Sequence, residues 1–185
     1  IACAELSGVI SNPLLGKVRE GIEAARTFRV QAVLAVGGGS VIDTGKAIAA
    51  GIPFDGDVWE FFTGTQELTD ALPVYTIVTL AAAASEMNGN SVITNEETRQ
   101  KYSIGSQCLN PKLSVVNPDL MMSVSKEYLA YSASDIIAHA IETYFTAVDH
   151  PRFQSRLVES IVKSVIELTD RLIEHPEDYH ARAEF

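Results

Sequence analysis

An aspartate and a histidine four residues apart could together bind a metal ion. Asp135 and His139 lie in a stretch whose apolar pattern predicts a helix, so both side chains should emerge on one face. One carboxylate and one imidazole suit Fe2+, Zn2+ or Mn2+ better than Ca2+. A catalytic zinc usually has three protein ligands, so this pair is only part of a site. The alternative is an acidic residue near the helix start and a hydrogen-bonded core histidine.

A run of three glycines could bind an anion. Residues 37–39 are all glycine, and they join an apolar run over 31–36 to a predicted helix over 41–50. Because the Cβ atoms are missing, a phosphate can approach the backbone, and the N–H groups at a helix start attract it. The spacing is neither the GxGxxG fingerprint nor a Walker loop. A tight turn between strand and helix, without a ligand, is therefore the alternative.

The residues that follow the glycines favour the start of a helix. Ser40 is expected to be the N-cap, and Asp43 lies three residues later, close to the capping-box spacing. Lys46 lies one turn further along and could offset the charge of Asp43.

The elements around these residues have the pattern of a parallel sheet wound by helices. A strand, a helix, a strand, the glycine loop and a second helix follow one another, which is the order of an α/β fold. The first of these helices is predicted over 14–28, where apolar residues recur every three or four positions. The predicted strands are a remnant at 2–6, a run buried on both faces at 31–36, a buried run at 72–80, a possible pair at 88–94 and 102–104, and a last strand at 113–116.

The second part of the chain is predicted to be helical. Long helical patterns cover 127–148 and 151–174, and Pro176 ends the second of them and precedes a third helix. We therefore expect an α/β nucleotide-binding part over 1–120 and the start of a helical domain over 121–185.

Charge and composition exclude several classes of protein. The 185 residues include 14 Lys and Arg and 24 Asp and Glu, so the formal net charge is −10 and nucleic-acid binding is not expected. No apolar run approaches the ~20 residues of a membrane span, and no signal-peptide pattern is present. Cys3 and Cys108 stand far apart, which fits a reducing compartment, so we expect a cytoplasmic protein. The chain opens without Met and stops inside a helical pattern, so we expect an excerpt of a longer protein.

Three motifs together resemble the iron-containing alcohol dehydrogenase family, with the closest likeness to its butanol-dehydrogenase-like branch. Residues 37–46, GGGSVIDTGK, resemble its GGGSxxDxxK signature, and residues 85–97, SEMNGNSVITNEE, are similar to its SE…VIT-[DN]-EE stretch. The sequence DIIAH at 135–139, followed by Glu142, is similar to the DxxxHxxE metal helix of that family. The order and spacing of the three motifs agree over nearly the whole chain.

The resemblance implies a fold and an activity. The fold would be a Rossmann-like dinucleotide-binding part followed by an all-helical metal-binding domain, as in the dehydroquinate synthase-like fold, here truncated. The activity would be a metal-dependent hydride transfer between NAD or NADP and a small-molecule alcohol or aldehyde, with Fe2+ or Zn2+ polarising the substrate oxygen. The family also implies a homodimer, and neither nucleic acid nor a membrane as partner.

The resemblance also assigns roles to individual residues. Asp135 and His139 would be two of four metal ligands, the other two being histidines further along the family's chain, and no catalytic residue beyond the metal ligands is implied. For Leu120 a place in the core, and for Lys101 a solvated charge, are the alternatives. The residues that match cofactor-contacting positions of relatives are Gly38, Gly39, Ser40, Thr79, Asn90, Lys101 and Leu120.

One departure from the family pattern concerns the phosphate-facing loop. Relatives usually carry Thr-Gly before the Ser-Glu pair, whereas Ala83 and Ala84 precede Ser85 here. The loss of one hydrogen bond to a charged acceptor would cost about 1.5–3 kcal/mol, so cofactor binding could be weak. Two alternatives therefore accompany the dehydrogenase hypothesis. One is a zinc-dependent relative similar to glycerol dehydrogenase or dehydroquinate synthase, and the other is a nucleotide-binding fold without catalysis.

Overall fold

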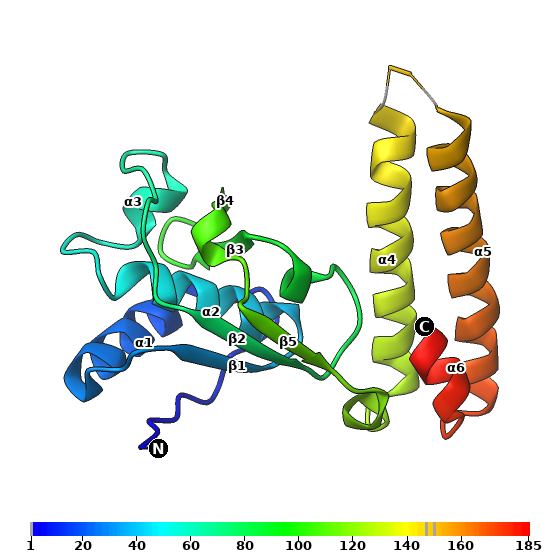
Figure 1. The fold of residues 1–185 in the computed structure, drawn as a ribbon, viewed down its shortest axis with the longest axis horizontal. Coiled ribbons are helices and arrows are strands. Elements are labelled where there is room, and N and C mark those ends of the chain that lie inside the picture. The colour runs from blue at the N-terminus through cyan, green and yellow to red at the C-terminus, as the bar shows by residue number, and fades with distance from the viewer. Residues whose placement is uncertain (1, 147, 150) are drawn as a thin grey trace. The chain divides into compact units, whose positions relative to one another are not determined.

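The computed structural model describes residues 2–146, 148–149 and 151–185, which form two compact units (Figure 1). The first unit comprises the residues up to Val78 together with Ala84–Val115, and the second comprises Thr79–Ala83 and Val116–Phe185. The division after Val115 lies close to the domain boundary expected at residues 120 and 121.

A three-stranded sheet forms the centre of the first unit. Its order is β1 (Val33–Gly37), β2 (Val74–Val78) and β5 (Leu113–Val116). Strands β1 and β2 are parallel, and their register pairs Val33 with Val74 and Gly37 with Val78. The two strands therefore end side by side, and the glycine run begins at this carboxyl edge, where α/β proteins commonly bind ligands.

One helix covers a face of this sheet, and a second helix packs on the first. Helix α2 (Gly39–Gly51) packs on β1 and β2, and the apolar side of α1 (Leu15–Phe28) is buried, in part against α2. A Cβ atom on Gly45 would lie only 3.1 Å from the Cβ atom of Ala35. The absence of a side chain at Gly45 therefore lets the helix lie close to the strand.

A β-hairpin completes the first unit. Strands β3 (Asn90–Asn95) and β4 (Gln100–Gly105) pair antiparallel, which confirms the pairing predicted around the charged stretch. Three short turns surround the hairpin: α3 (Trp59–Phe62), η1 (Ser85–Met87) and η2 (Gln107–Leu109). The short helix α3 lies within a stretch that has few other regular features.

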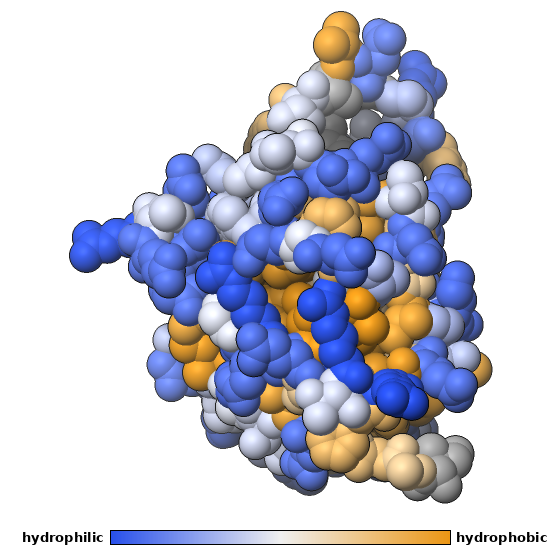
Figure 2. Space-filling view, turned by 90° about the vertical axis from the view of Figure 1, so that its left-hand side faces the viewer, coloured by the Kyte–Doolittle hydropathy of each residue, from blue (hydrophilic) through white to orange (hydrophobic). Residues whose placement is uncertain are grey.

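Two predictions about the strands are wrong. Residues 2–6 form no strand, because their backbone pairs with no strand among the residues that the structure describes. Strand β1 is buried on one face only, since Leu34 is 60% exposed and Val36 is 54% exposed. The reason is that α2 covers only the face that carries Ala35. Figure 2 shows that apolar side chains also reach the surface on one side of the molecule, where hydrophilic residues border them.

The second unit is helical, as predicted. Helices α4 (Lys126–Thr146) and α5 (Arg152–Glu174) lie side by side, and the short α6 (Tyr179–Glu184) packs against α5 (Figure 1). A 3-10 turn, η3 (Pro118–Met121), precedes α4. Ala147, inside the range predicted for the first long helix, lies outside the described residues. The buried centre of this unit consists of Leu129, Leu168, Leu172 and Ala181.

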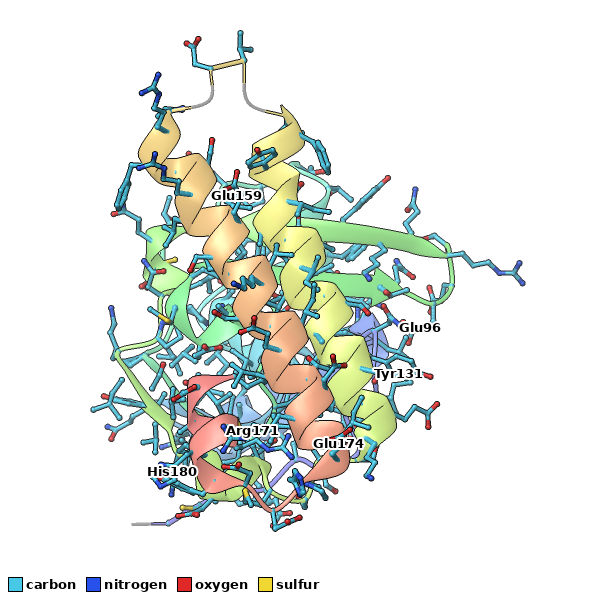
Figure 3. The ribbon with its side chains drawn as sticks, turned by 90° about the vertical axis from the view of Figure 1, so that its right-hand side faces the viewer. Glu96, Tyr131, Glu159, Arg171, Glu174 and His180 are labelled. Carbon is cyan, nitrogen blue, oxygen red and sulfur yellow. The ribbon has the colours of Figure 1, made fainter. Side chains whose placement is uncertain are left out.

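An ion pair fixes the start of α6. The side chain of Asp178 accepts a hydrogen bond from the backbone N–H of Ala181 at 2.9 Å, so it is the N-cap of the helix. Arg171, labelled in Figure 3, donates from Nε to Oδ2 of Asp178 at 2.7 Å. Both interactions lower the pKa of the Asp178 carboxyl, the backbone hydrogen bond most. Among the helices described, none is long and apolar enough to cross a membrane.

Candidate functional site

The glycine run forms the turn between β1 and α2. Gly38 is the N-cap of the helix, and its carbonyl oxygen accepts from the N–H groups of Val41 at 3.0 Å and Ile42 at 3.1 Å. The prediction that Ser40 caps the helix is wrong, because the helix starts earlier and Ser40 lies inside its first turn. The N–H groups of Gly39 and Ser40 precede these first helical donors, so helix geometry leaves them without an acceptor inside the helix.

The turn leaves space for a ligand beside Gly39. A Cβ atom placed on Gly39 would meet no described atom within 4 Å, whereas one on Gly37 would lie 2.5 Å from the side chain of Val41. Gly37 is therefore required by packing, and Gly39 presents open backbone at a helix N-terminus. This arrangement fits a pyrophosphate, since N–H donors and the helix dipole both favour an anion there.

Two further cofactor candidates are connected to this edge of the sheet, Thr79 through the chain and Asn90 through a hydrogen bond to α2. Thr79 is half-buried and directly follows Val78, the register partner of Gly37. Asn90 is the first residue of β3, and its side chain is exposed while its carbonyl oxygen accepts from Lys46 Nζ at 2.8 Å.

Lys101 is on the same hairpin as Asn90 but does not lie beside it. Asn90 pairs with Gly105, and Lys101 lies four residues before Gly105 on β4, which is about 13 Å along a strand. The exposed Lys101 ammonium donates to Oδ1 of Asn12 at 2.8 Å. Leu120 lies in η3 and is 42% exposed, so the alternative of a core residue does not fit the described chain.

Lys46, a buried lysine on α2, is the centre of a hydrogen-bond network that the sequence did not reveal. Lys46 is fully buried, and its ammonium donates to the carbonyl oxygen of Ser85 at 2.6 Å and to the hydroxyl of Ser85 at 3.0 Å. It also donates to Asn90 O at 2.8 Å and to Asn88 Oδ1 at 3.2 Å. A signal for such burial exists in the sequence, because the neighbours of Lys46 in TGKAIAAG are small or apolar.

Ser85 bridges the charges of Lys46 and Asp43. Its hydroxyl donates to Oδ1 of Asp43 at 2.5 Å, and the backbone N–H of Val92 donates to Oδ2 at 3.0 Å. Burial lowers the pKa of Lys46 to about 8, against the attraction of Asp43 and Glu86. Burial also raises the pKa of Asp43, against its hydrogen bonds from Ser85 and Val92. Lys46 and Asp43, which were predicted to offset each other's charge, are therefore linked by hydrogen bonds through the hydroxyl of Ser85.

The proposed metal ligands lie on consecutive turns of α4. His139 Nε2 is 3.8 Å from Asp135 Oδ1, and His139 Nδ1 is 4.0 Å from Glu142 Oε2. The side chains of Asp135 and His139 are 47% and 56% exposed, so a core histidine does not fit the described chain. Tyr131, labelled in Figure 3, lies one turn before Asp135 and donates to Glu127 at 2.5 Å.

The donor set on α4 is incomplete. No group of three or more His, Cys, Asp or Glu that could hold a metal is found among the residues that the structure describes. Asp135 and His139 nevertheless offer an oxygen and a nitrogen donor on one helix face, which is a suitable part of a site for Fe2+ or Zn2+.

Comparisons with known proteins agree with these features. The sequence model of the family described as iron-containing alcohol dehydrogenase matches residues 1–118. The chain is 44% identical over 178 residues to a probable NADH-dependent butanol dehydrogenase 1 of Bacillus subtilis, covering 96% of this chain and 46% of the relative. It is 41% identical over 183 residues to NADH-dependent butanol dehydrogenase A of Clostridium acetobutylicum, covering 99% and 47%.

A solved structure gives the same result for the fold. The crystal structure of NADH-dependent butanol dehydrogenase A from Thermotoga maritima matches with a TM-score of 0.95 and 44% identity, covering 98% of this chain and 45% of that one. The chain thus spans about half the length of the relatives that it matches. The Rossmann-like part followed by helices is confirmed as the fold of this half. The chain belongs to the iron-containing alcohol dehydrogenase family.

Proposed function

We propose that the protein transfers hydride between NADH or NADPH and a small alcohol–aldehyde pair, with a divalent metal, Fe2+ or Zn2+. The observation that carries this proposal is the turn at Gly39, whose open backbone begins a helix at the carboxyl edge of parallel strands. The names of the Bacillus and Clostridium relatives specify NADH and butanol, so NADH and a short-chain aldehyde are the first pair to test.

The turn would bind the pyrophosphate of the cofactor. The N–H groups of Gly39 and Ser40 would donate to its oxygens, and Gly38 would let the phosphates approach the chain. We keep Thr79, Asn90, Lys101 and Leu120 as further proposed contacts. Lys101 would have to exchange an existing partner, the side chain of Asn12.

Asp135 and His139 would hold the metal together with ligands from outside this chain. The bound metal would supply a positive charge that polarises the carbon–oxygen bond of the substrate. His139 must present a neutral ring nitrogen to the ion, and Asp135 a charged carboxylate. Both side chains are about half exposed, so they can turn toward an ion without breaking a buried contact.

Ala83 and Ala84 are the reason for a second candidate, a nucleotide-binding protein without catalysis. Ala84 has φ 54° and ψ 41°, a left-handed conformation that glycine adopts more easily. The backbone of this turn therefore follows a course that suits glycine, and Ser85 keeps its hydrogen bonds to Lys46 and Asp43. What the alanines remove is a side-chain donor.

The test is turnover by the complete protein, loaded anaerobically with Fe2+ or Zn2+ and supplied with butanal. We expect metal-dependent consumption of NADH, or of NADPH, followed by absorbance, and the reverse reaction with butanol. Tight dinucleotide binding by calorimetry without any turnover over a series of short alcohols and aldehydes would favour the binding protein. Conversion of a substrate without net change in NADH would favour a ring-forming lyase similar to dehydroquinate synthase.

We further propose that the protein is a cytoplasmic homodimer. The two distant cysteines fit a reducing compartment, since the described chain contains both as free thiols. The dimer rests on family analogy, and sedimentation of the complete protein tests it.

A further inference from the structure

The ammonium of Lys46 connects α2 to the segment over residues 85–90. Its four acceptors belong to Ser85, Asn88 and Asn90, and all of them lie at least 39 residues away in the sequence. Three of its acceptor distances, to Ser85 O, Ser85 Oγ and Asn90 O, are 3.0 Å or shorter. A fully buried ammonium with this many acceptors is a strong attachment, because hydrogen bonds from a charged donor are stronger than neutral ones.

A second set of contacts attaches the same face of α2 to the same segment. Asp43, one turn before Lys46, accepts from Ser85 Oγ at 2.5 Å and from Val92 N at 3.0 Å. Its carbonyl oxygen accepts from the hydroxyl of Ser91 at 2.8 Å. The segment from Ser85 to Val92 is therefore attached to α2 at both ends.

These contacts lie directly behind the proposed cofactor turn. Helix α2 begins at Gly39, and Asp43 and Lys46 occupy its second and third turns. The attached segment includes Asn90, a proposed cofactor contact. The carbonyl groups of Ser85 and Asn90 point at the ammonium, so an apolar side chain at position 46 would leave them without that donor and release the segment.

We infer that Lys46 is a positioning residue for the dinucleotide site, which sets the position of Ser85 and Asn90 relative to the glycine turn. The inference rests on the proposed function. No described atom lies within 4 Å of a Cβ placed on Gly39, so Lys46 does not occupy the open side of the turn. Its effect should therefore fall on cofactor affinity, while the chemical step at saturating cofactor stays nearly the same.

A cation on α1 that binds the other end of α2 offers a control. Arg26 donates from its guanidinium to the carbonyl oxygens of Gly51 at 2.8 Å and Ile52 at 3.2 Å, and also to that of Phe54. Like Lys46 it is a cation that binds backbone carbonyls around α2. Its acceptor Gly51 lies about 18 Å from Gly39 along the axis of α2. The loss of Arg26 should therefore weaken the fold without changing the cofactor site.

The experiment compares Lys46→Met and Arg26→Met in the complete, metal-loaded protein. We expect Lys46→Met to raise the Kd and KM for NADH at least tenfold, while kcat at saturating NADH stays within about threefold and the metal content is unchanged. Arg26→Met should lower Tm but leave the Kd for NADH at the wild-type value. NADPH replaces NADH throughout if it is the cofactor that the wild type prefers.

A second variant keeps the inference testable if Lys46→Met does not fold. Ser85→Ala removes only the bridging hydroxyl and should raise the Kd for NADH about threefold or more. An unchanged Kd in a folded Lys46→Met or Ser85→Ala protein overturns the inference, and so does an equal rise in Arg26→Met. A wild-type protein that binds neither dinucleotide overturns the proposed function as well, whereas normal wild-type binding with unchanged variants overturns only the role of Lys46.

Discussion

Asp135 and His139 lie one turn apart on α4, with Oδ1 of the aspartate 3.8 Å from Nε2 of the histidine. Their separation is longer than a hydrogen bond, and both side chains are about half exposed. Each group therefore keeps a lone pair for another partner. This is the relationship expected of two ligands that share one ion with residues from elsewhere in the protein.

The first prediction is that His139→Ala abolishes metal-dependent turnover of the complete protein. Removing a partner that only orients a ligand typically costs 10- to 100-fold in affinity or activity, so removal of a ligand should cost at least about 100-fold. Metal content by atomic spectroscopy and NADH consumption measure the effect. His175→Ala is the control, because His175 is also an exposed histidine but lies at the end of α5. Full metal content and turnover in His139→Ala would contradict the ligand assignment.

The second prediction separates the two glycines of the turn. Gly39→Ala adds a Cβ atom in open space at the start of a helix, so the free energy of unfolding should stay the same or rise by up to about 1 kcal/mol, because alanine restricts the unfolded chain. The same atom would stand where the pyrophosphate approaches, so the KM for NADH should rise about tenfold or more. Gly37→Ala should instead destabilise the protein, since its Cβ would lie 2.5 Å from the Val41 side chain. Normal NADH affinity in Gly39→Ala would remove the turn from the cofactor site.

Local patterns in the sequence predicted most of the elements correctly. The last strand, 113–116, has the predicted bounds, and the helix predicted over 14–28 begins one residue later. Such elements follow from the spacing of apolar residues, which the sequence shows directly. The exposed face of β1 did not follow from it, because an apolar run reveals which residues can be buried and not which neighbours cover them.

The parts of the site that were missed depend on distant residues. Ser40 was a good N-cap by type, but the carbonyl group of Gly38 takes that place and needs no side chain. Lys46 finds its acceptors at least 39 residues away, and no local pattern indicates them. For the metal pair the reverse holds, since the spacing of Asp135 and His139 on one helix is a local property that the sequence already contains.

The third prediction concerns the left-handed alanine before Ser85. The left-handed conformation costs an L-residue such as alanine about 1–2 kcal/mol, and it costs glycine little. Part of this advantage of glycine is lost, because glycine has more conformational freedom in the unfolded chain. Ala84→Gly should therefore raise the free energy of unfolding by about 1 kcal/mol, measured in urea. Ala83→Gly is the matched control, since Ala84 has positive φ and Ala83 does not, and it should lower stability. Equal effects of the two substitutions would show that the conformation of Ala84 is not the cause.

The fourth prediction is that Lys46 makes stability depend on pH in the alkaline range. Burial lowers the pKa of its ammonium from 10.5 to about 8 in the folded protein. Between these two values the unfolded chain binds a proton that the folded chain has released, so the contribution of this group to the free energy of unfolding rises with pH. The slope can reach about 1.4 kcal/mol per pH unit. The raised pKa of Asp43 acts in the opposite sense, because the folded protein keeps a proton that the unfolded chain has released.

Urea unfolding of the wild type and Lys46→Met between pH 7.5 and 10.5 tests this prediction. The variant is expected to be less stable at pH 7.5, because the carbonyl groups of Ser85 and Asn90 lose their donor. The difference in stability should then increase with pH, since only the wild type gains from the release of the Lys46 proton. Tyrosines and cysteines titrate in both proteins and cancel in the difference. A difference that stays constant over this range would mean that the ammonium keeps an ordinary pKa despite its burial, and that the acceptors around it compensate fully for the loss of water.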